Sequence, residues 1–174
     1  MRPERIVILG NAGSGKSTLS QMVGEKLDCY VTHLDKLFWS PGWIKPDPEE
    51  FRVKVTEATN APMWISEGNY ARRTFDIRLP KADLVIWLNT PRIICMIRVL
   101  IRSLRNEQRP DLPDGCTEKI NYEFFEFLRY VWDFDEKYRP KIEKLRIECG
   151  ENVRVIYLSN KKQIQHFLAK LGES

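Results

Sequence analysis

The octapeptide GNAGSGKS at residues 10–17 matches the phosphate-binding pattern G-x-x-x-x-G-K-[ST] at every fixed position. Glycines in this pattern let the backbone turn its N–H groups around a phosphate, and the helix that follows adds the positive end of its dipole. Lys16 would neutralise the β- and γ-phosphates, and the Ser17 hydroxyl would bind Mg²⁺. The pattern and the residue after it predict a nucleotide-phosphate site made of Gly10, Asn11, Ala12, Gly13, Ser14, Gly15, Lys16, Ser17 and Thr18.

Two carboxylates follow predicted strands. Asp35 comes after an apolar run at residues 29–34, and Glu67 comes after one at 63–66. Ligands of open parallel sheets bind outside the carboxyl ends of the strands, so either carboxylate could hold Mg²⁺ through water or accept a proton from an attacking hydroxyl. The alternative is that Asp35 caps a helix and Glu67 lies in a surface turn.

Four arginines are spaced so that they would share one helical face if a helix continued through all of them: Arg98, Arg102, Arg105 and Arg109. A guanidinium group binds phosphoryl oxygens through two parallel hydrogen bonds and stays charged, so this row predicts contacts with a transferring phosphate. The alternative is a solvated face paired with nearby acids such as Glu107 and Asp111.

Residues for an acceptor follow the two carboxylates. After Glu67 the chain reads Gly-Asn69-Tyr70-Ala and then carries Arg72 and Arg73, a basic pair that could grip an anionic group of the acceptor. In the segment after Asp35, aromatic faces could sandwich a base or sugar, or form the hydrophobic plug of a small lid; these are Phe38, Trp39 and Trp43. The two histidines, His33 and His166, are interpreted as structural.

Strand and helix patterns alternate along the chain, which predicts a parallel sheet covered by helices on both faces. Strands are expected at residues 5–9, 29–34, 63–66, 83–88 and 153–158. Helices are expected at residues 16–27, 48–60, 92–105, 117–133 and 136–149, with a last one that Ser159 caps and that ends at Leu171. Thr90 and Pro91 are typical of the start of the helix at 92–105. Residues 106–116, with Pro110, Pro113 and Gly115, predict an exposed loop.

Composition limits the class of protein. A chain of 174 residues with 43% hydrophobic content predicts a single domain over residues 1–174, with a mobile lid insert at about 102–117. A net charge of +4 without a block of like charge permits nucleic-acid binding but does not indicate it. Widely separated cysteines argue against a zinc site or a disulfide framework. Because the first strand starts near the N-terminus and Arg98 interrupts the apolar stretch at 93–101, we expect a cytoplasmic protein with no membrane partner.

The ordered set of motifs resembles the P-loop nucleoside monophosphate kinase group, in particular its adenylate-kinase-like DNA topology modulation (FlaR-type) proteins. The resemblance extends over nearly the whole chain and rests on the segments VILGNAGSGKSTL, LDKLFWSPGW, WISEGNY, RLPKADLVIWLNTPR and RPDLPDGC. It implies a three-layer α/β/α P-loop NTPase fold, with a five-stranded parallel sheet of order 2-3-1-4-5 and a short arginine-bearing lid. It also implies that a nucleotide base lies near Ser159, Asn160 and Lys161.

The acceptor is left open by this resemblance. Adenylate kinases carry D-G-F-P-R after the third strand, whereas this chain reads EGNYARR at residues 67–73. We expect a phosphotransferase that uses Mg²⁺ and ATP, or another nucleoside triphosphate, to phosphorylate a small anionic or hydroxyl-bearing acceptor such as a nucleotide. The alternative is a nucleotide-dependent, DNA-associated regulator that binds ATP without a small acceptor. A simple hydrolase is disfavoured, because no predicted strand ends in an acidic pair that would position water.

Overall fold

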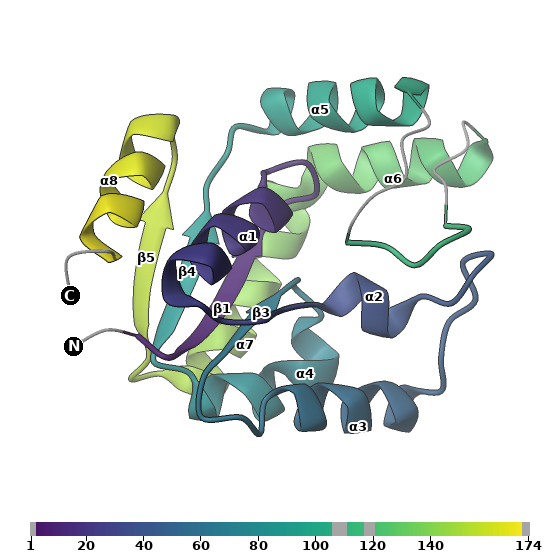
Figure 1. The fold of residues 1–174 in the computed structure, drawn as a ribbon. Coiled ribbons are helices and arrows are strands. Elements are labelled where there is room, and N and C mark those ends of the chain that lie inside the picture. The colour runs from purple at the N-terminus through teal and green to yellow at the C-terminus, as the bar shows by residue number, and fades with distance from the viewer. Residues whose placement is uncertain (1–2, 106–110, 117–120, 172–174) are drawn as a thin grey trace.

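Five parallel strands form one sheet in the order β2-β3-β1-β4-β5. The computed structural model describes residues 3–105, 111–116 and 121–171. The strands are β1 (Arg5–Gly10), β2 (Val31–His33), β3 (Trp64–Glu67), β4 (Leu84–Leu88) and β5 (Arg154–Leu158). Sheet, order and flanking helices agree with the predicted three-layer α/β/α arrangement (Figure 1).

The alternating side chains of β1 divide the core into two layers. Ile6 and Ile8 face α1 (Lys16–Leu27) and α8 (Lys161–Leu171), whereas Val7 and Leu9 face α4 (Ala71–Arg78) and α7 (Arg139–Gly150). All four side chains are fully buried, as expected for the central strand of a parallel sheet with both faces covered. The central strand is therefore a rigid base for the loop that follows it.

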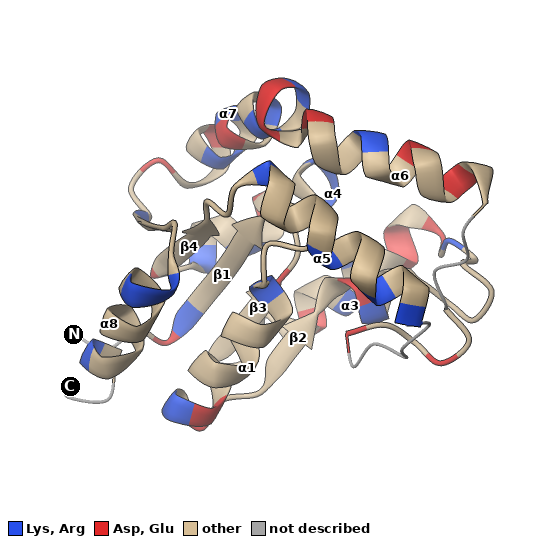
Figure 2. Ribbon diagram, turned by 90° about the horizontal axis from the view of Figure 1, so that it is seen from above, with Lys and Arg blue, Asp and Glu red and all other residues tan. Residues whose placement is uncertain are grey.

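The remaining helices lie around the carboxyl edge of the sheet. On the β2 side, α2 (Leu34–Phe38) packs on α3 (Pro48–Ala58). Across the edge, α5 (Arg92–Arg105) packs on α6 (Tyr122–Asp133) through Cys95, Val99, Phe124 and Val131 (Figure 1). Figure 2 looks down on this edge and shows basic positions along α5 and acidic positions along α6. None of the helices in the described ranges is long and apolar enough to cross a membrane.

Strand register brings the predicted site residues to this edge. Glu67 is aligned with Ile8 of β1 on one side and with His33 of β2 on the other, and Gly10 is aligned with Leu88. The ends of β1, β2 and β3 therefore lie side by side, and the segments after them meet above the sheet.

Two elements differ from the sequence prediction around the second and third strands. The second strand ends at His33, so Asp35 lies inside α2 and not after a strand. An unpredicted helix, α4, follows β3; its buried residues are Thr74, Phe75 and Arg78, and two polar side chains among three leave no clear apolar period.

The predicted bounds of α5 are confirmed, whereas the cap of α8 and the break before α7 need correction. The Thr90 hydroxyl donates to the carbonyl of Ser14 in the P-loop (2.9 Å) and so fastens the loop to the start of α5. At α8 the capping side chain is Asn160, whose Oδ1 accepts from the N–H of Gln163 (2.9 Å), and not Ser159. Between α6 and α7 the expected break is instead a π-helical turn, η2 (Phe134–Tyr138), that joins the two helices.

The described part of the segment after α5, residues 111–116, is not the fully exposed loop that its prolines and glycine predict. Asp111, Leu112 and Cys116 are buried, and the Cys116 thiol donates to the carbonyl of Ser40 (3.3 Å). Residues 106–110 and 117–120, including Arg109, lie outside the described residues. The described part of this segment, residues 111–116, packs onto the loop that carries the tryptophans.

Candidate active site

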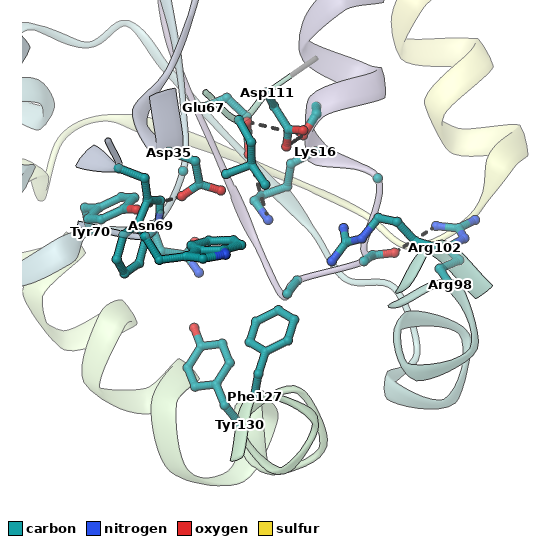
Figure 3. Close-up of a pocket in the computed structure, with 18 of the residues that line it drawn as sticks. Lys16, Asp35, Glu67, Asn69, Tyr70, Arg98, Arg102, Asp111, Phe127 and Tyr130 are labelled. Carbon is teal, nitrogen blue, oxygen red and sulfur yellow. Dashed lines mark hydrogen bonds and ion pairs between the residues drawn. The ribbon is translucent and has the colours of Figure 1, made fainter. Parts of the chain in front are cut away.

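A cavity of about 1020 Å³ opens at the carboxyl edge of the sheet. Figure 3 shows Lys16, Glu67 and Asp111 close together, with Arg98 and Arg102 on one side and Asp35, Asn69 and Tyr70 on the other. Phe127 and Tyr130 of α6 close the cavity from a further side (Figure 3). A cavity of this size can enclose much of a small ligand. It joins much of the predicted phosphate site to five of the predicted acceptor residues: Asp35, Trp39, Trp43, Asn69 and Tyr70.

The phosphate loop has the backbone that its glycines predict. Gly10, Gly13 and Gly15 all have positive φ angles, of 146°, 73° and 99°. A Cβ atom at Gly13 would lie 2.5 Å from the backbone oxygen of Cys95, so α5 approaches the loop too closely for any side chain at this position. Lys16 Nζ donates to the carbonyl of Asn11 (3.0 Å) and so lies across the loop.

Side chains from two other segments, Asn69 after β3 and Arg98 of α5, hold the loop. The amide of Asn69 accepts from the N–H of Gly10 (3.1 Å) and donates to its carbonyl (2.9 Å). Arg98 Nη1 donates to the carbonyls of Gly13 and Ser14, both at 3.2 Å. Because these contacts use mainly carbonyl groups, they leave the N–H groups at the start of α1, which have no partner within the helix, to face an anion.

Two carboxylates lie beside the Ser17 hydroxyl. Ser17 Oγ is 2.7 Å from Asp111 Oδ2 and 3.4 Å from Glu67 Oε2. Glu67 Oε1 is 3.9 Å from Lys16 Nζ, and Glu67 Oε2 is 2.9 Å from His33 Nδ1. His33 thus contacts the site and does more than fill the core, and Asp111 enters the site from a segment that its composition predicted to be exposed.

These oxygen atoms suit Mg²⁺. Magnesium prefers hard oxygen ligands and commonly takes one or two carboxylates, with the rest supplied by substrate phosphates and water. Ser17 and Glu67 offer oxygen atoms of this kind on one side of the cavity, and Asp111 accepts a hydrogen bond from the Ser17 hydroxyl. The described residues contain no cluster of three or more His, Cys, Asp or Glu side chains that could hold a metal ion.

The opposite end of the cavity combines a carboxylate with aromatic rings. The Tyr70 hydroxyl donates to Asp35 Oδ1 (2.7 Å), and burial raises the pKa of Tyr70, so this donor keeps its proton. Burial also raises the pKa of Tyr130 to about 12. Trp39 and Trp43 line the same end with their rings edge to face at 5.1 Å.

A buried arginine that sequence reasoning missed supports the segment after β3. Arg78 is fully buried, and its guanidinium donates to the carbonyls of Gly68 (3.1 Å) and Asn69 (2.6 Å). It also donates to the side chains of Ser66 and Thr74. Burial lowers the pKa of Arg78 to about 9, which measures how strongly this position disfavours charge. Arg78 therefore fixes the backbone from which Asn69 reaches the P-loop.

Only some of the other predicted site residues with described positions reach the cavity. Arg98 and Arg102 line it, Arg105 is exposed at the end of α5, and Arg109 is outside the described residues. Arg72 and Arg73 are exposed on α4, and the Arg73 guanidinium lies 5.4 Å from the centre of the Phe38 ring. Phe38 is buried between α2 and α3. At the end of β5 are three exposed residues that do not line the cavity: Ser159, Asn160 and Lys161.

Comparisons with known proteins agree with this arrangement. No protein-family model matches the sequence. The sequence is similar to adenylate kinase 2 from Nostoc sp. (strain PCC 7120 / SAG 25.82 / UTEX 2576), with 32% identity over 133 residues that cover 60% of this chain and 72% of the relative.

Two solved structures share the fold, the five-stranded sheet of P-loop kinases. Shikimate kinase from Bacteroides thetaiotaomicron superimposes with a TM-score of 0.61 and 20% identity, covering 98% of this chain and 97% of that one. A gluconokinase from Sinorhizobium meliloti 1021 superimposes with a TM-score of 0.54 and 14% identity, covering 99% and 95%. At sequence identities this low, the similarity shows a shared fold and no more.

Proposed function

Because the chain belongs to the adenylate kinase family of P-loop kinases, we propose that it transfers the γ-phosphoryl group of ATP to a small acceptor, with Mg²⁺. One observation carries the proposal. A single cavity connects a complete P-loop and two arginines to a separate end lined by Asp35 and aromatic rings. An ATP-binding regulator without an acceptor has no need of that second end.

On the donor side we assign four roles. Residues 10–18 surround the β- and γ-phosphates, and Lys16 offsets their charge. Ser17 and Glu67 hold Mg²⁺, which when bound neutralises charge on the β- and γ-phosphate oxygens. Arg98 and Arg102 approach the transferring group from α5. Ser159, Asn160 and Lys161 are kept as the proposed contact for the donor base.

On the acceptor side we assign Asp35 as the proton acceptor. A hydroxyl oxygen of the acceptor attacks the γ-phosphorus, and a new oxygen–phosphorus bond forms as the bond to the β,γ-bridging oxygen breaks. The phosphorylated acceptor and ADP are the products, and the hydroxyl proton passes to the Asp35 carboxylate, which Tyr70 holds in place. Trp39, Trp43 and Leu112 cover this end and would keep water from competing with the acceptor.

We propose further that the chain belongs to one subgroup of this family, the topology modulation proteins. The tryptophan-bearing segments support this assignment. The subgroup's name implies a role in DNA supercoiling, but the described site has the parts of a kinase. We therefore propose phosphoryl transfer as the activity, and treat DNA binding as the outcome that would oppose it.

The test is a screen for acceptor-dependent ADP release. Purified protein with ATP and MgCl₂ is incubated with nucleosides, nucleotides, sugars and hydroxy acids, and ADP is measured by a coupled assay. We expect at least one compound to raise ADP release well above the rate without acceptor, and Lys16→Ala to abolish the increase. Sequence-selective DNA binding that survives physiological salt, with no active acceptor, would support the regulator instead.

A further inference from the structure

We infer that the acceptor carries no phosphate and is a nucleoside, or a compound like one that combines a hydroxyl group and a planar ring without negative charge. The inference rests on the proposed phosphotransferase activity and specifies its substrate. It departs from the nucleotide acceptor that the resemblance to monophosphate kinases implies. The evidence for this inference is the distribution of charged side chains in the cavity.

Positive charge is confined to one side of the cavity. Among its described lining residues the cations are Lys16, Arg98 and Arg102, which belong to the P-loop and to α5. Figure 3 shows the two arginines on the side away from Asp35 and Tyr70. A triphosphate with four negative charges needs these cations, so they serve the donor, and the described lining of the cavity holds no other lysine or arginine for a second phosphate.

The other described arginines near the acceptor end either bind protein groups or lie outside the cavity. Arg52 forms a two-point ion pair with Asp76 (3.1 and 2.6 Å) and also donates to the carbonyl of Arg73. Arg78 lies under the site, but it is fully buried and its guanidinium already donates to four protein oxygens. Arg72 and Arg73 are exposed on α4 and do not line the cavity. A phosphate at this end would meet none of these groups.

The acceptor end instead presents negative charge. Asp35 is the carboxylate that lines this end, and it accepts a hydrogen bond from the Tyr70 hydroxyl. An ionised carboxylate only accepts hydrogen bonds, so it recognises a hydroxyl and repels a phosphomonoester dianion. This arrangement selects against the phosphorylated form of an acceptor and for its unphosphorylated form.

Aromatic rings define the shape of the expected acceptor. Five aromatic residues from three different segments of the chain line the cavity: Trp39, Trp43, Tyr70, Phe127 and Tyr130. Flat faces from several directions favour a planar ring between them, as base–aromatic stacking does in nucleic-acid sites. A nucleoside has such a ring and also offers sugar hydroxyls to Asp35.

Calorimetry on paired ligands tests the inference directly. The donor site is first saturated with Mg²⁺ and a non-transferable ATP analogue, so that a monophosphate cannot enter the P-loop. The common ribonucleosides and deoxyribonucleosides are then titrated, each against its own 5′-monophosphate. We expect at least one nucleoside to bind about tenfold or more tightly than its monophosphate. A monophosphate that binds more tightly than every nucleoside, or no binding by either class, would overturn the inference.

Asp35→Asn tests the origin of the selection. The asparagine keeps an oxygen for the Tyr70 hydroxyl and removes the charge, so the preference for the uncharged ligand should fall by about tenfold. Glu57→Gln is the matched control, since Glu57 is exposed on α3 and does not line the cavity. An unchanged preference in Asp35→Asn would contradict the role of this charge.

The two proposals fail in different ways. If nucleosides bind selectively but no ADP or phosphorylated product forms, the phosphotransferase fails and the selectivity of the pocket stands. If ADP forms only with nucleoside monophosphates, the phosphotransferase stands and the inference about the acceptor is wrong.

Discussion

The carboxylate of Asp111 accepts a hydrogen bond from the hydroxyl of Ser17 at 2.7 Å, across 94 positions of sequence. A hydroxyl that binds a cation uses its lone pairs and still has its hydrogen to donate. Asp111 is nearer to that hydrogen than Glu67 is, because Glu67 lies 3.4 Å away. In the proposed enzyme Asp111 would therefore orient the Ser17 oxygen toward a bound Mg²⁺, as groups behind metal ligands generally do.

Removing this carboxylate should raise the requirement for magnesium. We expect Asp111→Asn to increase the Mg²⁺ concentration for half-maximal activity by about 10-fold or more, because groups behind metal ligands typically contribute 10–100-fold. Asp114→Asn is the control, since Asp114 is exposed in the same segment. The measurement is ADP release as a function of free Mg²⁺ at fixed ATP. Equal magnesium curves for the two variants would contradict the orienting role.

The contact between the P-loop and α5 gives a second prediction. A Cβ atom at Gly13 would lie 2.5 Å from the backbone oxygen of Cys95, whereas at Gly42 it would meet nothing within 4 Å. Both glycines have a positive φ, of 73° and 79°, so an alanine at either position strains the backbone. Only an alanine at Gly13 also clashes, and the difference between the two variants therefore measures the free-energy cost of the clash. We expect Gly42→Ala to cost about 1–2 kcal/mol of stability.

Gly13→Ala should cost more, about 3 kcal/mol or above, and should abolish ATP binding because α5 or the loop must move. Thermal unfolding and titration with ATP measure the two effects. Similar losses in the two variants would show that the loop can shift away from α5 without harm.

Local spacing was enough to predict the parts of the fold that depend on neighbouring residues. The P-loop pattern predicted the strand, turn and helix around residues 10–17, and the start and stop signals around residues 92–105 predicted α5 at its observed bounds. Alternation of strands and helices predicted a parallel sheet, and the family resemblance gave its order.

Long-range side-chain contacts could not be predicted in this way. The amide bridge between Asn69 and Gly10 spans 59 positions, and nothing in the sequence near either residue indicates it. The sequence indicated Asp111 only in the alternative interpretation, as an acid paired with the arginine row, because its neighbours are prolines and a glycine that usually mark exposed loops. Arg78 was missed for a similar reason, since an arginine in a polar helix is ordinarily at the surface and this one is fully buried.

An ion pair between the start of β1 and the start of β4 gives a prediction on pH. Asp83 accepts from the N–H groups of Glu4 and Arg5, and also from the Arg5 guanidinium (2.7 Å). The hydrogen bond from the Arg5 side chain is the main cause that lowers the pKa of Asp83. The unfolded chain, with an ordinary aspartate pKa of about 3.9, therefore binds the proton first as pH falls.

The contribution of Asp83 to stability should be complete above about pH 5 and should be lost as pH falls through its lower, folded-state pKa. We expect Asp83→Asn to lower the unfolding midpoint by several degrees at pH 7, and the difference from the unmodified protein to shrink below about pH 3. Thermal unfolding followed by circular dichroism over this range measures it. A difference that stays constant with pH would show that the aspartate charge contributes nothing.

The fate of the γ-phosphoryl group is the most direct test of phosphoryl transfer at this site. Protein, Mg²⁺ and ATP labelled with ³²P at the γ-position are incubated with the best acceptor from the screen, and the labelled products are separated. We expect the label on the acceptor, in an amount equal to the ADP formed, and we expect Lys16→Ala to lose it through about 2–5 kcal/mol of transition-state stabilisation. Label found only in inorganic phosphate, or transfer that persists in Lys16→Ala, would contradict the account.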